Sequence, residues 1–340
     1  MPTLPLPTPG QDLSASEVRE AITALLDPSI DDDAKADFLV ALRQKGESES
    51  EIACFVQCLL EHAVVPPLDP HRLPGPLIDI CGTGGDGLEL FNISTATMFV
   101  LAAAGACVVK HGNRAITSRC GGADVLEELG IRIDLDPSTL NERLAKSGLA
   151  FLFAPLYHPA FKAIAPIRKQ LAAAGKSSVF NLLGPLLNPV QPDFQLVGVH
   201  SPSLTKMYAS VMQKLGRKKA WAVHGCGTDE LTLAGPSIGH EATPTEVRSL
   251  SIEPSDARLS MAPNETLKGG DRAANAEIIV NILSNQASGP RRDVVILNAA
   301  AALVVCGLAK DLGEAAENAS RCVTDGRAFA KLESLRSLSH

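Results

Sequence analysis

The 340-residue sequence lacks the marks of a membrane protein or of a disulfide-rich one. No run approaches the roughly 18 consecutive apolar residues that a membrane-spanning helix requires, and no charged segment followed by an apolar one opens the chain. The eight cysteines include no C-x-x-C pair, and the closest two, Cys54 and Cys58, lie one helical turn apart on an apolar face. We therefore interpret all eight as reduced thiols and expect a cytoplasmic protein without membrane contact.

The sequence also lacks an excess of positive charge. Its 31 Lys and Arg residues are outnumbered by 38 Asp and Glu residues, and the net charge of −7 provides no overall attraction to nucleic acid or to an anionic membrane. An anionic ligand would therefore have to be bound by local groups. Hydrophobic residues make up 45% of the chain, and Ala-rich stretches alternate with short Val, Ile and Leu runs, which is typical of a globular α/β protein.

The N-terminal part is predicted to be helical after a short tail. Residues 1–10 hold four prolines and are predicted to form a disordered tail. Three helices follow, and two of them begin with a capping box, in which a serine precedes a glutamate by three positions: Ser14 with Glu17, and Ser48 with Glu51. The first and third helices have strongly apolar faces, so they need packing partners.

A proline-rich segment, residues 64–76, predicts a boundary between a helical domain over residues 11–75 and a larger domain over residues 76–340. Beyond it, short β-like runs alternate with helices. We expect strands at residues 77–80, 107–109, 131–135, 149–153, 194–199 and 220–223. Such alternation is typical of a mostly parallel central sheet covered by helices, and the Ala-rich helix expected at residues 293–308 should be buried against that sheet.

A glycine-rich loop follows the first of these strands. Residues 81–87 have the sequence Cys-Gly-Thr-Gly-Gly-Asp-Gly, and a helix is expected at residues 94–104. Glycines at the end of a strand let backbone N–H groups surround an anion, and the helix adds the positive end of its dipole. No Gly-Lys-Ser/Thr of a Walker sequence follows the loop, and a glycine-rich loop alone is weak evidence, so a phosphate or pyrophosphate site and a plain strand-to-helix turn are both open.

A second loop, with cations, hydroxyls and glycines, follows the next strand. Lys-His-Gly-Asn-Arg occupies residues 110–114, and further hydroxyl and glycine residues lie between it and a helix expected at residues 123–129. Ligands of open α/β sheets bind outside the carboxyl ends of the strands. Both loops are therefore expected to face one crevice.

Further segments accompany these two loops in a fixed order. The full set is GTGGDG followed by FNIST (residues 82–95), KHGNR (110–114), GGADVLEELG (121–130), HPAFK (158–162), NLLGPLLNP (181–189), VHGCGTDEL (223–231) and LNAAAALVV (297–305). Together they resemble the successive signatures of the anthranilate phosphoribosyltransferase family over nearly the whole chain after the tail. The resemblance implies a small all-helical N-terminal domain, joined in space by residues of about 157–190, plus a larger α/β domain, and a homodimer formed through the helical domain.

The resemblance also implies a site for PRPP and metal. By position, the implied PRPP-binding residues are Gly82, Thr83, Gly84, Gly85, Asp86, Asn92, Ser94, Thr95, Lys110, His111, Gly112, Asn113, Thr117 and Gly122. Lys110, Asp229 and Glu230 are implied as catalytic groups that act electrostatically, without a covalent nucleophile. Ser94, Asp229 and Glu230 are implied ligands of Mg²⁺, with two ions per subunit. Without the resemblance, the two acids would be interpreted as part of a solvated loop.

A second implied set of residues would bind the acceptor, anthranilate: Gly82, Asn113, His158, Arg168 and Gly184. Arg168 offers a planar, bidentate partner for a carboxylate, although by itself it would be interpreted as a surface charge. Residues 169–179 form a slightly longer stretch than the usual family pattern, which either extends a helix or changes the acceptor tunnel. Ala115 and Gly122 replace serines that many family members have.

The implied activity is transfer of the 5-phosphoribosyl group of PRPP to the amine of anthranilate, which gives N-(5-phosphoribosyl)anthranilate and pyrophosphate in tryptophan biosynthesis. Two alternatives are weaker. A pyrimidine-nucleoside phosphorylase-like enzyme would share the fold, but residues 79–86 lack its Lys-x-Ser-Thr-Gly-Gly pattern. A catalytically silent homologue that binds nucleic acid is opposed by the acidic charge balance and by the complete set of PRPP and metal residues.

Overall fold

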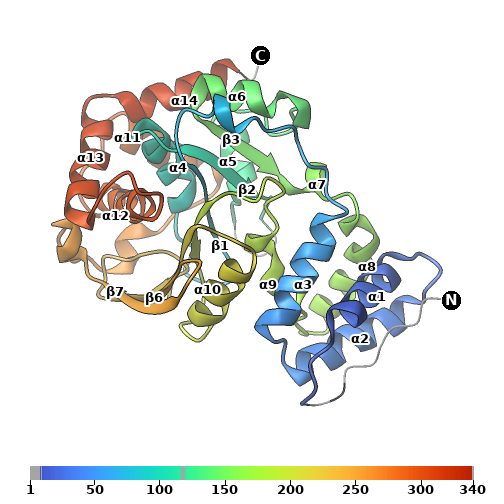
Figure 1. The fold of residues 1–340 in the computed structure, drawn as a ribbon. Coiled ribbons are helices and arrows are strands. Elements are labelled where there is room, and N and C mark those ends of the chain that lie inside the picture. The colour runs from blue at the N-terminus through green and yellow to red at the C-terminus, as the bar shows by residue number, and fades with distance from the viewer. Residues whose placement is uncertain (1–7, 9, 116–118, 339–340) are drawn as a thin grey trace.

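The computed structural model describes residues 8, 10–115 and 119–338, in a helical part and an α/β part (Figure 1). The helical part contains α1 (Ala15–Leu26), α2 (Asp32–Lys45), α3 (Glu49–Leu60), α8 (Phe161–Ala173) and α9 (Phe180–Leu183). Capping boxes at Ser14 and Ser48 begin α1 and α3, as predicted. Figure 1 shows these helices gathered at one end of the molecule.

Apolar faces hold the helical part together. In α8, Ile164, Ile167 and Leu171 recur at helical spacing and are buried. They belong to the same core as Phe38 of α2 and Phe55 of α3. A helix far along the chain thus completes the bundle that the first three helices begin.

The α/β part is built on a seven-stranded sheet with the order β3-β2-β1-β4-β5-β6-β7. Its strands are β1 (Leu77–Gly82), β2 (Cys107–Gly112), β3 (Leu149–Phe153), β4 (Phe194–Gly198), β5 (Lys219–Gly225), β6 (Ser237–Ala242) and β7 (Val247–Ile252). The first five strands run parallel, and β6 and β7 pair antiparallel at one edge. The predicted fold class, a helical domain with a larger, mostly parallel α/β domain, is confirmed.

Helices cover both faces of this sheet (Figure 1). One face packs against α4 (Ile93–Ala103), α5 (Gly122–Glu128), α11 (Arg272–Leu283), α12 (Pro290–Val305), α13 (Leu312–Thr324) and α14 (Arg327–Ser337). The other packs against α10 (Leu204–Lys214), the helical part, α6 (Leu140–Ser147) and α7 (Ala154–Tyr157). Because side chains alternate along a strand, Leu196 faces the first layer and Val197 the second.

Short 3-10 turns connect several of these elements, at Pro70–Arg72, Pro137–Thr139, Gly184–Leu186, Pro254–Ala257 and Asn264–Leu267. The first of them lies within the proline-rich segment, which otherwise forms neither helix nor strand. In the part of the chain that the structure describes, no helix has the length and apolar character needed to cross a membrane.

Two predictions about strands were incomplete or wrong. The strand predicted at residues 131–135 is wrong, because this segment has irregular backbone. Ile131 and Ile133 are buried in the main core, so their alternation reflected burial and not pairing with a neighbouring strand. Strands β6 and β7 were not predicted, because polar residues and glycine interrupt the first and the second is largely exposed at the sheet edge.

The strand order brings the functional segments to one edge of the sheet. From β1 the chain proceeds to β2 and β3 on one side, and it then returns to β4 and β5 on the other. The order reverses between β1 and β4, which is where open α/β sheets bind ligands, outside the carboxyl ends of the strands. The glycine loop (residues 81–87) follows β1 and the second loop (residues 110–122) follows β2, so both lie at this edge.

Candidate active site

The glycine loop has the backbone geometry of an anion site. Gly84, Gly85 and Gly87 have φ of 68°, 87° and 71°, a region that residues with side chains rarely adopt. At the start of the loop, the Thr83 amide donates to the Gly198 carbonyl over 2.9 Å. Residues in such conformations turn successive N–H groups inward, so the loop can offer several donors to one anion.

Asp229 packs directly against the glycine loop. Its Oδ2 accepts a hydrogen bond from the Gly84 amide over 2.6 Å. A Cβ at Gly82 would lie 2.2 Å from the same oxygen, and a Cβ at Gly198 would lie 1.5 Å from the Asp229 carbonyl oxygen. The acid loop (residues 228–231) therefore lies against the ends of both strands. Glycine is required at the end of β4, where a Cβ would meet backbone, whereas a Cβ at Gly82 would displace the Asp229 side chain. Gly198 was not predicted as a site residue.

The acidic side chains at this point repel one another. Burial, and then the charge of Asp86, raises the pKa of Asp229 to about 6, and burial, and then the charge of Asp229, raises the pKa of Glu230 to about 8. Among the described residues, no group of three or more His, Cys, Asp or Glu side chains is placed to hold a metal ion by itself. Mg²⁺ commonly takes one or two carboxylates together with substrate phosphates. The acid pair therefore fits a divalent cation that is shared with a ligand.

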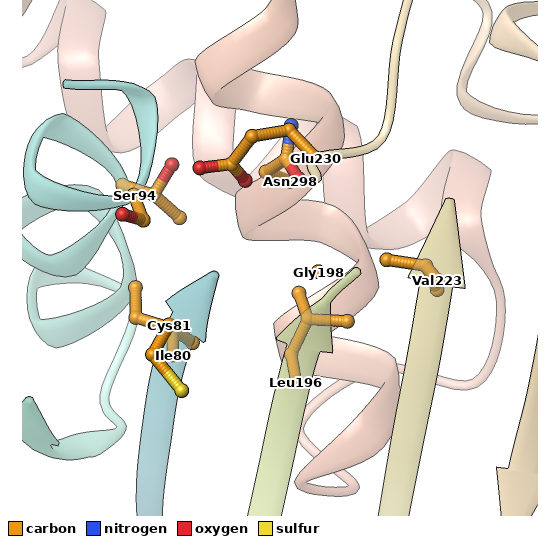
Figure 2. Close-up of a pocket in the computed structure, with 9 residues that line it drawn as sticks. Ile80, Cys81, Ser94, Leu196, Gly198, Val223, Glu230 and Asn298 are labelled. Atoms are coloured by element: carbon orange, nitrogen blue, oxygen red, sulfur yellow. The ribbon is translucent and has the colours of Figure 1, made fainter. Parts of the chain in front are cut away.

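Lys110 supplies a positive charge beside these acids. Its side chain is buried, and its Nζ donates to the Ile80 carbonyl over 2.7 Å and to Ser94 Oγ over 3.1 Å. Ser94 lies in the first turn of α4, and Figure 2 shows it and Glu230 directed toward each other above the ends of β1 and β4. The charge of Lys110 opposes the rise in the pKa of Glu230. Three predicted site residues from three separate motifs thus meet here.

Asn92 and Thr95 connect the glycine loop region with the second loop. Asn92 Nδ2 donates to the Cys120 carbonyl over 3.1 Å, and its Oδ1 accepts from Nδ2 of Asn275 over 3.0 Å. A Cβ at Gly122 would lie 3.4 Å from Thr95 Oγ1. Asn275, a buried residue of α11, was not predicted from the sequence. The available signal was an amide side chain among apolar residues, since buried polar groups need partners.

The described residues of the second loop are held by acidic side chains of α5, the helix that follows it. Asp124 accepts hydrogen bonds from the amides of Ala115 and Gly121 over 3.0 and 2.9 Å. Arg114 pairs with Asp124 and with a second acid of α5, so its charge is neutralised locally. Thr117, predicted to bind PRPP, lies outside the described residues. Arg119 pairs with Glu89, just beyond the glycine loop, over 2.9 Å, and Lys110, at the start of the second loop, is the cation whose charge acts on Glu230.

Two predicted residues from different motifs, His111 and His158, pack edge to face with ring centroids 5.1 Å apart. The Nε2–H of His158 donates to the Leu187 carbonyl over 2.8 Å, and the Gly184 backbone lies next to the His111 ring. Burial, and then His158, lowers the pKa of His111 to about 3, and burial also lowers the pKa of His158. Both rings are therefore neutral at pH 7 and add no charge to this side of the site.

Arg168 has no polar contact with the other predicted acceptor residues that the structure describes. It is half-buried on α8, and within the described ranges it makes no hydrogen bond or ion pair. It lies two helical turns after Phe161, so the two share a face of α8, and the Phe161 ring lies 5.5 Å from that of His158. Asn113 makes no hydrogen bond with Arg168 among the described residues, and its carbonyl accepts from the Ala123 amide over 3.3 Å.

The longer stretch at residues 169–179 extends a helix. Helix α8 continues to Ala173, and Gly175, with a φ of 65°, turns the chain after it. The residues at this helix end are exposed. Residues 169–173 thus belong to α8, and an effect of this stretch on the acceptor tunnel stays a prediction.

Comparisons with known proteins agree with this architecture. Residues 8–63 match the helical bundle domain of the glycosyl transferase family, and residues 74–329 match its a/b domain. The chain is 45% identical over 328 residues to the anthranilate phosphoribosyltransferase of Methanocorpusculum labreanum, with 96% of this chain and 94% of that protein covered. It is 44% identical over 335 residues to that of Thermomicrobium roseum, with 97% and 94% covered.

Solved structures give the same result. Anthranilate phosphoribosyltransferase from Thermus thermophilus superposes with a TM-score of 0.88 at 38% identity, and 96% of each chain is covered. The Saccharomyces cerevisiae enzyme in complex with PRPP and Mg superposes with a TM-score of 0.85 at 27% identity, over 96% of this chain and 93% of that one. The chain therefore belongs to the glycosyl transferase family that has this helical bundle domain and this a/b domain. It is similar to these anthranilate phosphoribosyltransferases over nearly its whole length. The resemblance stated from the sequence is confirmed.

Proposed function

We propose that this enzyme transfers the 5-phosphoribosyl group of PRPP to the amine of anthranilate, giving N-(5-phosphoribosyl)anthranilate and pyrophosphate, a step of tryptophan biosynthesis. Relatives at 45% and 44% identity, matched over nearly their whole length, are anthranilate phosphoribosyltransferases. Two hydrogen bonds carry the proposal. The Gly84 amide donates to Asp229 over 2.6 Å, and Lys110 donates to Ser94 over 3.1 Å. Amide donors, a buried cation and an acid pair at one point suit a metal-bound diphosphate.

The PRPP site is proposed to comprise residues of both loops and the start of α4. These are Gly82, Thr83, Gly84, Gly85, Asp86, Asn92, Ser94, Thr95, Lys110, His111, Gly112, Asn113, Thr117 and Gly122. Amide and hydroxyl donors fit phosphate oxygens, and Asn92 can bond ribose hydroxyls or phosphate. The close packing of Asn92, Thr95 and Lys110 about the two strand ends supports this set.

We propose that Ser94, Asp229 and Glu230 bind Mg²⁺, with two ions per subunit. The raised pKa values of both acids support the need for a cation, and the S. cerevisiae relative holds PRPP together with Mg. When bound, Mg²⁺ would supply charge neutralisation at the pyrophosphate. Titration with Mn²⁺ in the presence of PRPP tests the number, since a stoichiometry of one per subunit would contradict it.

Anthranilate is proposed to bind between the loops and the helical part, near Gly82, Asn113, His158, Arg168 and Gly184. The Arg168 guanidinium is half-buried and has no ion pair among the described residues, so its planar fork is available to a carboxylate. The His158 ring, whose pKa is lowered by burial, would contact the aromatic ring of anthranilate. The S. cerevisiae relative in complex with 4-fluoroanthranilate, at 26% identity and a TM-score of 0.83, supports an acceptor of this class.

Catalysis is proposed to rest on positioning and electrostatics. The bond between the anomeric carbon and the pyrophosphate oxygen breaks, the amine lone pair forms the new C–N bond, and the nitrogen then releases a proton. Lys110 and the glycine-loop amides stabilise the charge that develops on the departing pyrophosphate. Because an aromatic amine has a free lone pair, neither a covalent nucleophile nor a strong general base is required.

The organisation around the site is also part of the proposal. We assign residues 11–75, together with about 157–190, to the helical domain and residues 76–340 to the α/β domain, and we expect closure about residues 64–76 to exclude water from PRPP. A homodimer through the helical domain and a cytoplasmic location complete this proposal. Solution scattering with saturating PRPP tests closure, which loses its support if the angle between the domains does not change.

The reaction itself is tested by turnover of PRPP with anthranilate, followed by product fluorescence, in Mg²⁺ and in a chelator. We expect product in Mg²⁺ and none in the chelator. Absence of turnover while PRPP still binds would reject anthranilate as the acceptor and leave the donor site standing.

A further inference from the structure

Helix α12 contains one polar residue in a stretch that is otherwise apolar. Between residues 294 and 305 every side chain is Val, Ile, Leu or Ala except Asn298, and Asn298 is only 2% exposed. Asparagine is a poorer helix former than the alanines that follow it, and burial of an amide costs free energy unless it is hydrogen-bonded. The position therefore has a cost that needs a compensating interaction.

The amide of Asn298 makes that interaction with the acid loop. Its Oδ1 accepts from the Leu231 amide over 3.1 Å, and its Nδ2 donates to the Leu231 carbonyl over 3.0 Å. A third bond, from Nδ2 to the Val294 carbonyl over 2.9 Å, lies within α12 and would satisfy one donor without any contact to the loop. The two bonds to Leu231 therefore form a bidentate clamp on one backbone unit.

The clamp holds the backbone of Leu231, which directly follows Glu230. On the other side, Glu230 is held by Thr228, whose hydroxyl accepts from the Glu230 amide over 3.2 Å and donates to the Glu230 carbonyl over 2.9 Å. With both sides fixed, the Glu230 side chain points toward Ser94, as Figure 2 shows, with Asn298 behind it. All three line one cavity of about 10 Å³, which is roughly the space one water molecule requires.

We propose that Asn298 is a positioning residue for the acid loop, which holds the Glu230 carboxylate in the orientation needed for a divalent cation shared with the diphosphate. The inference rests on the proposed function of the same site. Groups that orient metal ligands without touching the metal typically contribute about 10- to 100-fold to metal affinity. We therefore expect loss of the clamp to weaken cation binding to this extent and to leave recognition of the acceptor unchanged.

Two substitutions separate the clamp from the packing of the helix. Asn298→Ala removes both bonds and leaves a small cavity in a helix of high intrinsic propensity. Asn298→Leu removes both bonds at similar volume, so it provides a second variant if the first is poorly folded. Thr97→Val is the matched control, because Thr97 is buried, lines the same cavity, and donates only to the Ile93 carbonyl of its own helix.

The test measures binding directly. Mn²⁺ is titrated calorimetrically into each variant with PRPP present and no acceptor, and thermal unfolding in a chelator records stability. We expect the Kd for Mn²⁺ to rise about 10- to 100-fold in both Asn298 variants and to change less than about twofold in Thr97→Val, with the KM for anthranilate unchanged in all three.

Lower thermal stability with a wild-type Kd for Mn²⁺ would overturn the inference and leave Asn298 a purely structural residue. Failure of the wild type to turn over anthranilate would instead reject the proposed function, independently of the comparison of Mn²⁺ affinities.

Discussion

The proposed donor site and the proposed acceptor site are built in opposite ways. On the donor side, backbone amides, Lys110 and two carboxylates converge over short distances at the ends of parallel strands, and a glycine is obligatory at the end of β4 because the chain segments touch. On the proposed acceptor side, burial lowers the pKa of His158, whose ring packs against that of His111 from the proposed PRPP set, and the Arg168 guanidinium has no hydrogen bond or ion pair among the described residues. We therefore expect binding of PRPP to depend mainly on backbone geometry, and binding of the acceptor to depend on a few side chains.

The largest effect should come from the acid pair. Asp229→Asn combined with Glu230→Gln keeps the shape of both side chains but removes both charges. We expect kcat/KM for PRPP to fall about 10³-fold, because charge stabilisation at the leaving group is lost. Steady-state kinetics at saturating Mg²⁺ measures this, and the dissociation constant for anthranilate should stay near the wild-type value. A loss of less than about tenfold would break the distinction between the two sides.

A pair of glycine substitutions compares the two sides sterically. Gly198→Ala places a Cβ 1.5 Å from the Asp229 carbonyl oxygen, so the acid loop must move, whereas a Cβ at Gly184 meets nothing within 4 Å. Displacement of a reactive group by about 1 Å can cost about 10²-fold in rate, which we expect for Gly198→Ala. Gly184→Ala should change only the KM for anthranilate, by a few-fold. Equal effects of the two variants on PRPP kinetics would contradict the account.

Arg168 tests the acceptor side alone. Arg168→Ala should raise the KM for anthranilate about 10- to 100-fold, since a hydrogen bond to a charged group contributes about 1.5 to 3 kcal/mol. The KM for PRPP should be unchanged. Lys169→Ala, which removes an exposed charge from the next position of the same helix, is the matched control and should resemble the wild type. If Arg168→Ala impaired PRPP and anthranilate equally, Arg168 would not be an acceptor-specific residue.

Glu230 and His111 should make opposite contributions to the pH dependence of stability in the absence of metal. The pKa of Glu230 is raised from 4.5 to about 8, so the folded state binds more protons than the unfolded state between these values, and stability falls as pH rises. The pKa of His111 is lowered from 6.5 to about 3, so stability falls as pH drops below about 6.5. We expect Glu230→Gln to raise the free energy of unfolding by about 4 kcal/mol at pH 8, since each unit of pKa shift corresponds to about 1.4 kcal/mol, and to change it little near pH 4.5. Denaturant unfolding in a chelator measures the free energy of unfolding at both pH values. An identical pH dependence for Glu230→Gln and the wild type would contradict a raised pKa of Glu230 as its cause.

The structure joins predicted donor residues by hydrogen bonds and does not do so, in the part of the chain that it describes, for the predicted acceptor residues. There is a physical reason why the donor pattern is easier to see in the sequence. A glycine loop after an apolar strand, and a lysine after the next one, are local patterns, and parallel strands bring their carboxyl ends together without further information. Gly198 was missed because its need for glycine arises from contact with the acid loop, which is distant in sequence. Asn275 and Asn298 were missed as contacts because their partners lie far away along the chain. The strand wrongly predicted at residues 131–135 shows the same limit, since alternation indicates burial without revealing what a segment pairs with.

The central claim, that metal-bound donor recognition and acceptor recognition are separable, is tested most directly by equilibrium binding of PRPP. Calorimetry in Mg²⁺ would compare the wild type with the Asp229→Asn, Glu230→Gln double variant and with Arg168→Ala. The account predicts that the double variant binds PRPP at least about tenfold more weakly, as the wild type should in a chelator, and that Arg168→Ala binds it normally. PRPP binding that is insensitive to the acid pair and to the chelator, but weakened by Arg168→Ala, would contradict it.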